Sequence, residues 1–163
     1  FTMPAEKMIP SATSQTESTV LDASLPKVWN LFRSFAFEKI APGQVSSTEF
    51  ESGGAGVVGA VVKMTYTDGT VWRIRVTEVS ERHHTLAYEL LTAEPAHAAT
   101  SVQMEIKMLS VTTENHTFIS WLSEFSNDAD VAIISDQKYK KQEFFKDVKS
   151  NLWAAINVPS SLS

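Results

Sequence analysis

Residues 57–79, VVGAVVKMTYTDGTVWRIRVTEV, decide the fold because they contain two strand-like runs on either side of a short turn. Apolar and polar side chains alternate along Val57–Tyr66 and Val71–Val79, which is the pattern of strands with one buried face. Asp68-Gly69 lies between the runs and is the strongest hairpin signal in the chain. The stretch therefore predicts two antiparallel strands joined by a tight turn.

Five further segments have the composition of strands and are bounded by turn signals. They are Gln15–Asp22, Val45–Glu51, Thr85–Leu91, Val102–Val111 and Thr117–Phe125. Because the connections between most of them are short, they predict an antiparallel meander.

Two short helical pieces are expected between the first and second of these strands. Ser24 can cap a helix that has Pro26 near its first turn, and apolar residues recur at helical spacing from Val28 to Phe35. Phe37–Pro42 is predicted to be a second short helical or irregular piece.

The last segment predicts one long helix. Ser135–Asn157 contains no Gly or Pro and places Phe145, Val148 and Leu152 along one side. Strands gathered in the middle of the chain with helices at its ends indicate an α+β architecture. In such a fold the last helix covers the apolar face of the sheet.

The run ESGGAGVVG, residues 51–59, holds four of the six glycines in the chain. A phosphate-binding glycine loop requires a helix N-terminus after it, because the free N–H groups of the helix hold the anion. A strand-like run follows here, and the run lacks both the G-x-G-x-x-G spacing and the Lys-Ser/Thr pair of a Walker sequence. The pattern therefore favours a turn between strands.

Composition limits the classes of function. The chain has 163 residues, 43% of them hydrophobic, which fits one domain with one core. It has no cysteine, so no disulfide, thiol nucleophile or cysteine-based zinc site is expected. A net charge of −5 argues against nucleic-acid binding. The only local cluster of lysines is interleaved with acidic residues and is predicted to be a solvated helix face: Lys138, Lys140, Lys141, Lys146 and Lys149.

The expected domain covers residues 15–158. Residues 1–14 are predicted to be a flexible arm, in which residues 1–2 resemble a vector remnant, and residues 159–163 a tail. No apolar run has the ~20 residues that a membrane span needs, so a soluble, cytoplasmic protein without stable membrane insertion is expected.

Several short motifs occur in an order typical of one superfamily: Val20–Phe32, Lys39–Pro42, Ser46–Glu49, the glycine run, Thr67–Gly69 and Phe118–Phe125. In this order the chain resembles the START-like helix-grip superfamily, which includes Bet v I plant allergens, polyketide cyclase/dehydrases and lipid-transfer domains. The resemblance implies a curved seven-stranded antiparallel sheet wrapped around a long C-terminal helix, with two short helices between the first and second strands. It also implies that the glycine run is a tight turn between the second and third strands. There, Gly53, Gly54 and Gly56 would permit backbone angles that a side chain forbids.

In the plant allergens of this superfamily, sheet and helix enclose a large cavity for apolar or amphipathic molecules. The resemblance therefore implies binding or transport of a hydrophobic small molecule such as a lipid, a sterol or a polyketide-like compound. Each candidate residue can also serve as ordinary core. Alternation in the strands and the helical stripe select the candidates for the cavity wall: Val62, Met64, Tyr66, Trp72, Ile74, Leu86, Tyr88, Leu90, Val102, Met104, Ile106, Met108, Ile119, Trp121, Phe145, Val148 and Leu152.

No cofactor or metal is predicted. The histidines His83, His84, His97 and His116 have no spacing typical of a metal site, and the adjacent pair His83-His84 is expected to be exposed near a turn. No G-x-S-x-G motif indicates a serine nucleophile.

An enzyme of the polyketide cyclase/dehydrase kind is the alternative. Tyr66, Tyr88 and Glu89, with Arg73 and Arg75 nearby, could supply acid–base chemistry if they face the cavity. Their simpler roles are structural, with the arginines and Glu89 on the outer face of the sheet.

The resemblance also includes plant helix-grip condensing enzymes, which use a lysine on the last strand. That strand has Ile119, Ser120 and Trp121 near the position and no lysine, which counts against this chemistry. A co-chaperone-like interaction domain is a third hypothesis, without specific support in the sequence. The expected oligomeric state is a monomer or a weak dimer.

Overall fold

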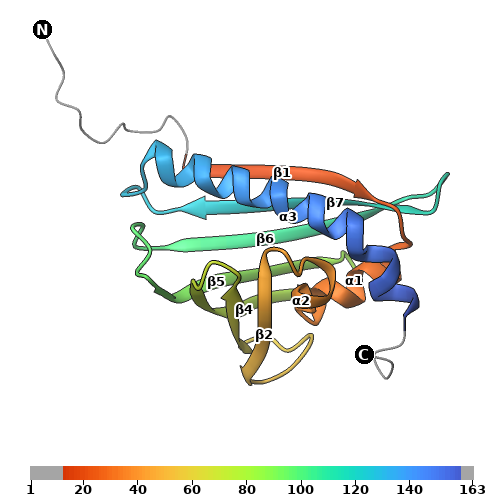
Figure 1. The fold of residues 1–163 in the computed structure, drawn as a ribbon, viewed down its shortest axis with the longest axis horizontal. Coiled ribbons are helices and arrows are strands. Elements are labelled where there is room, and N and C mark those ends of the chain that lie inside the picture. The colour runs from red at the N-terminus through yellow and green to blue at the C-terminus, as the bar shows by residue number, and fades with distance from the viewer. Residues whose placement is uncertain (1–12, 159–163) are drawn as a thin grey trace, which may run out of the picture.

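Seven strands form one antiparallel sheet in residues 13–158, the part of the chain that this computed structural model describes (Figure 1). The expectations for the N-terminal arm and the C-terminal tail lie largely outside these residues. In the sheet the strands follow the order β1-β7-β6-β5-β4-β3-β2. Their bounds are β1 Ser14–Leu21, β2 Val45–Ser52, β3 Val61–Tyr66, β4 Val71–Ser80, β5 Thr85–Glu94, β6 Val102–Val111 and β7 His116–Phe125.

The predicted hairpin at Asp68-Gly69 is confirmed. β3 and β4 pair with Met64 opposite Trp72, and Gly69 adopts a positive φ of 90°. The Asp68 carboxylate accepts a hydrogen bond from the Thr70 N–H at 2.9 Å, which closes the turn. The start predicted for the third strand at Val57 is wrong, because β3 begins only at Val61 and the preceding residues complete the glycine turn.

The glycine run connects β2 to β3, as the resemblance implies. Gly53, Gly56 and Gly59 have positive φ values of 71°, 74° and 90°. The expectation for Gly54 is wrong. Its φ lies outside the positive, left-handed region that favours glycine, and a Cβ at this position would meet no atom within 4 Å. At Gly53 a Cβ would lie 2.8 Å from the Ala60 Cβ, so both backbone angle and space require glycine.

Three helices complete the described fold: α1 Leu25–Arg33, α2 Phe37–Ile40 and α3 Val131–Asn157. Ser24 occupies the N-cap position of α1, but its side chain makes no capping hydrogen bond. α3 begins four residues before the predicted Ser135. The Asp130 carboxylate caps this start by accepting the Ile133 N–H at 2.9 Å. This arrangement confirms the α+β helix-grip fold.

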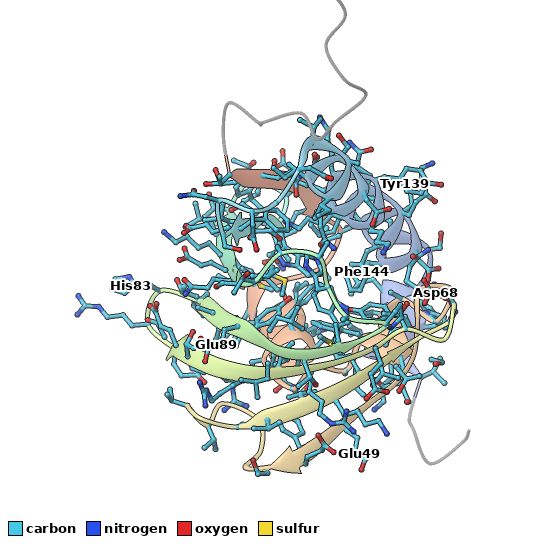
Figure 2. The ribbon with its side chains drawn as sticks, turned by 90° about the vertical axis from the view of Figure 1, so that its left-hand side faces the viewer. Glu49, Asp68, His83, Glu89, Tyr139 and Phe144 are labelled. Carbon is cyan, nitrogen blue, oxygen red and sulfur yellow. The ribbon has the colours of Figure 1, made fainter. Side chains whose placement is uncertain are left out.

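The core lies between the sheet and the helices. Figure 1 shows α3 running across one face of the sheet toward α1 and α2. Figure 2 shows Phe144 pointing from α3 toward the sheet, whereas Tyr139 on the same helix faces away and is 62% exposed. Phe145, Val148 and Leu152 are buried, as the helical stripe predicts.

Candidate ligand-binding site

A cavity of about 230 Å³ lies between α3 and the sheet, next to the turn between β3 and β4. β3, β4, β6 and β7 each contribute an inward side chain, because alternation places every second residue on this face. The residues that line it are Gly43, Gln44, Tyr66, Thr67, Asp68, Thr70, Trp72, Met104, Trp121, Gln137, Lys140, Lys141 and Phe144.

Aromatic rings form much of the apolar wall. The ring centroids of Trp121 and Phe144 lie 5.1 Å apart, and those of Tyr66 and Trp72 lie 5.9 Å apart, both pairs edge to face. Met104 lies on β6, between β7 and the β3–β4 hairpin in the sheet, and adds a flexible thioether to the wall. Such a wall suits a flat apolar molecule.

Four of the residues predicted for a cavity wall line this cavity: Tyr66, Trp72, Met104 and Trp121. Leu90 is partly buried against the core, and the others are buried in it without lining the cavity: Val62, Met64, Ile74, Leu86, Tyr88, Val102, Ile106, Met108, Ile119, Phe145, Val148 and Leu152. The segment containing α1 and α2 fills much of the remaining space. Phe35 packs on Tyr88 with ring centroids 5.5 Å apart, and Phe37 packs on Phe144 at 5.4 Å.

Lys141 is the most unusual residue of the wall. Its side chain extends from α3 into the interior, and the residue is only 3% exposed. Nζ donates hydrogen bonds to the backbone oxygen of Trp121 at 3.2 Å and to that of Gln15 at 3.4 Å. It also lies 5.7 Å from the centre of the Trp121 ring. Burial lowers the pKa of Lys141 to about 7, with the negative charge of Glu17 acting in the opposite direction.

The prediction that the lysine cluster is a solvated helix face is wrong for Lys141. Spacings of four, three and four residues connect Lys141 to Phe145, Val148 and Leu152, so it lies on the same buried side of the helix. Gln137, one turn earlier, is also buried. The helical periodicity could have identified both residues, but their polar character suggested an exposed face.

Two further polar groups are buried beside the cavity. The indole Nε1 of Trp121 is buried, and the Tyr88 hydroxyl lies near it. Burial raises the Tyr88 pKa. Burial also raises the pKa of the half-buried Tyr66, so both hydroxyls stay protonated and neutral at physiological pH.

The mouth of the cavity carries charged side chains of both signs. Asp68 is exposed at the tip of the β3–β4 turn, where Figure 2 labels it. Hydrogen bonds from Thr70 lower its pKa, and the nearby Lys140 lowers it further. Lys140 itself forms an ion pair with Asp136 at 3.0 Å.

The charged groups considered for acid–base chemistry lie on the outer face of the sheet. Arg73 pairs with Glu51 at 2.9 Å, and Arg75 pairs with Glu89. Figure 2 shows Glu89 on the side of the sheet away from α3. None of these side chains lines the cavity.

The histidines do not gather into a metal site within residues 13–158, and no group of three or more His, Asp or Glu side chains there could hold a metal ion. His83 is exposed, as predicted. The expectation for His84 is wrong, because its ring is half-buried against Trp29, with the ring centroids 5.3 Å apart. None of the helices described by the structure has the length and apolar character needed to cross a membrane.

No protein-family model and no curated protein sequence matches this chain. Solved structures do match over most of its length. A protein from Nitrosospira multiformis is 20% identical, with a TM-score of 0.71 and coverage of 84% of this chain and 94% of the other. The major latex-like protein 151 of Panax ginseng is 15% identical, with a TM-score of 0.68 and coverage of 84% and 95%. Ara h 8.0201 is 18% identical, with a TM-score of 0.69 and coverage of 86% and 97%.

These similarities confirm the helix-grip fold that the resemblance implies. The chain shares this fold with the three proteins over most of its length.

Proposed function

We propose that this protein binds a small apolar or amphipathic molecule in the cavity beneath α3. The observation that carries the proposal is a space of about 230 Å³ between α3 and the sheet, walled by aromatic rings and Met104. Apolar surface that a ligand buries contributes about 25 cal/mol per Å² to binding. The volume lies below the ~300–1,000 Å³ usual for drug-sized ligands, so the proposed ligand is small or enters only in part.

Binding is better supported than catalysis by the position of the charged groups. A cyclase needs acid–base groups at the substrate, but Arg73, Arg75 and Glu89 form ion pairs on the outer face. The tyrosine hydroxyl in the wall, that of Tyr66, has a raised pKa and is a poor base near neutral pH. The polyketide cyclase/dehydrase hypothesis therefore loses most of the groups on which it depends.

The finer expectations stay predictions. They are a lipid, sterol or polyketide-like ligand, a cytoplasmic location and a monomeric or weakly dimeric state. The cavity wall proposed to contact ligand is the set of residues that line it, rather than the whole inward face of the sheet.

Titration with the neutral dye N-phenyl-1-naphthylamine tests the proposal, because its fluorescence rises in apolar surroundings. We expect the native protein to enhance the fluorescence and Met104→Trp to raise the Kd by about tenfold or more, since the indole occupies the cavity. Ile106→Trp is the matched control, because Ile106 lies on the same strand and face, is fully buried and does not line the cavity. Its added volume should cost about 1–3 kcal/mol of unfolding free energy, more than Met104→Trp costs, and leave dye affinity nearly unchanged.

Absence of dye binding by the native protein would count against the proposal. So would equal losses of stability in the two tryptophan variants, because Met104 would then belong to a solid core.

A further inference from the structure

We propose that Lys141 anchors a carboxylate on the ligand, so that the natural ligand is a small amphipathic monocarboxylate. This inference rests on the proposed binding function and specifies the chemical class of the ligand. The apolar body would contact Trp72, Trp121 and Phe144, and the acidic group would meet the Lys141 amine at the cavity wall.

The hydrogen bonds of Lys141 are incomplete for a cation. An ammonium group has three N–H donors, and the structure provides two acceptors, the backbone oxygens of Trp121 and Gln15. Within residues 13–158 no carboxylate lies within 4.0 Å of Nζ. A ligand oxygen can therefore supply the third acceptor from the cavity.

The neighbouring lysines differ from Lys141 because each has a counter-ion. Lys140 pairs with Asp136 at 3.0 Å, and Lys138 lies 3.9 Å from Glu17. Both are exposed, whereas Lys141 is buried. A buried cation without a partner is costly, and a carboxylate at this position would remove that cost.

One more donor can assist the same acidic group. The buried Gln137 amide belongs to the cavity wall with Lys141. Both groups can donate a hydrogen bond, which suits a carboxylate that only accepts. An amine ligand would find a like charge here.

The charges around the cavity favour a single negative charge on the ligand. Asp68 and Asp136 lie at or near the mouth, and Glu17 on β1 contributes its field at Lys141. Lys140 and Lys138 already pair with Asp136 and Glu17, so Lys141 is the lysine of this group left for a ligand charge, and a second negative charge would lie near Asp68. A monocarboxylate is therefore favoured over a phosphate ester.

The affinity for a carboxylate should depend on pH through Lys141. In the protein without ligand, the pKa of the Lys141 amine is lowered to about 7. The cationic form of Lys141 therefore dominates at pH 6 and the neutral form at pH 9. The charged group that acts on it is Glu17 from β1, while Tyr66 from β3 and Lys140 from α3 line the same cavity and Lys138 of α3 pairs with Glu17. Tyr66 stays neutral across this interval because its pKa is raised.

Isothermal titration calorimetry with two probes of one shape tests the inference. Naphthalene-2-carboxylate carries the acidic group, and 2-naphthalenemethanol is its neutral counterpart. At pH 6 we expect the native protein to bind the carboxylate about tenfold or more tightly than the alcohol, because a charge-assisted hydrogen bond forms. At pH 9 this preference should be much smaller, whereas the Kd of the alcohol should change little.

Two lysine variants identify the anchor. Lys141→Met should abolish the preference and retain binding of the alcohol, which also shows that the variant is folded. Lys146→Met, an exposed lysine of α3 that does not line the cavity, should change the preference by less than about threefold, because exposed charges contribute little.

Each other outcome has a distinct meaning. Equal Kd values for the two probes in the native protein at pH 6 would overturn the inference and leave the binding function intact. A preference for the carboxylate that persists in Lys141→Met would also overturn it. Failure of both probes to bind would instead contradict the proposed function.

Discussion

At the scale of single residues, Lys141 combines a proposed role in ligand binding with a cost to the stability of the fold. Folding removes its amine from water and provides two backbone acceptors but no counter-ion within the described residues. The lowered pKa records the cost of this burial. A residue kept at such a cost is a strong candidate for a functional role.

Lys141→Met is therefore expected to stabilise the protein without ligand. The folded-state pKa of about 7 lies below the ordinary value of 10.5, so between these values the unfolded chain binds more protons. Stability of the native protein should accordingly rise with pH from about 7 to about 10 and be lowest, from this group, below pH 7. At pH 6, Lys141→Met should raise the free energy of unfolding by about 1–4 kcal/mol.

Urea denaturation of both proteins at pH 6 and pH 9.5 measures this effect, with the exposed Lys140→Met as control. The advantage of Lys141→Met should shrink at the higher pH. An advantage that is equal at the two pH values, or absent at both, would show that Lys141 is solvated in solution.

At the scale of elements, the two helices with polar N-cap residues differ in how they are held. The Asp130 side chain accepts the Ile133 N–H at the start of α3, whereas the Ser24 side chain makes no capping bond to α1. Asp130→Ala should therefore lower the free energy of unfolding by about 1 kcal/mol. Ser24→Ala should lower it by less than about 0.5 kcal/mol. Thermal denaturation of the pair checks this, and an equal loss in both variants would refute the assignment of Asp130 as the cap.

Most element positions follow from local patterns. Alternation predicted the β3–β4 hairpin, composition and turn signals predicted the other five strands, and the run without Gly or Pro predicted α3. The start of α3 was missed because Val131–Ile134 shows little amphipathic pattern, and the Asp130 cap defines that start instead. The expectation for Gly54 was wrong because composition identifies a glycine turn but does not show which of its residues need a positive φ. The backbone path of the turn gives a positive φ to Gly53, Gly56 and Gly59.

At the scale of the whole molecule, the size of the cavity depends on contacts between distant segments. Strand alternation correctly selected inward residues, but it could not show that Phe35 and Phe37 would fill the space above Tyr88. The cavity remains where Phe144 lies next to the β3–β4 turn. Sequence patterns therefore predicted the fold and part of the wall, whereas the volume follows from tertiary packing.

The four tryptophans of the chain provide the most direct test that ligand enters this cavity. Trp72 and Trp121 line it, Trp29 donates its indole N–H to Glu81 at 2.7 Å, and Trp153 is 73% exposed on the outside of α3. Each indole N–H gives one signal in a ¹H–¹⁵N NMR spectrum, so the protein carries two reporters in the cavity and two controls elsewhere.

The measurement is a titration of the ¹⁵N-labelled protein with naphthalene-2-carboxylate at pH 6, with indole signals assigned by single Trp→Phe variants. We expect the Trp72 and Trp121 signals to shift saturably with a common Kd while those of Trp29 and Trp153 stay in place. A shift of the Trp153 signal without changes at Trp72 and Trp121 would place the molecule on the surface and contradict binding in this cavity.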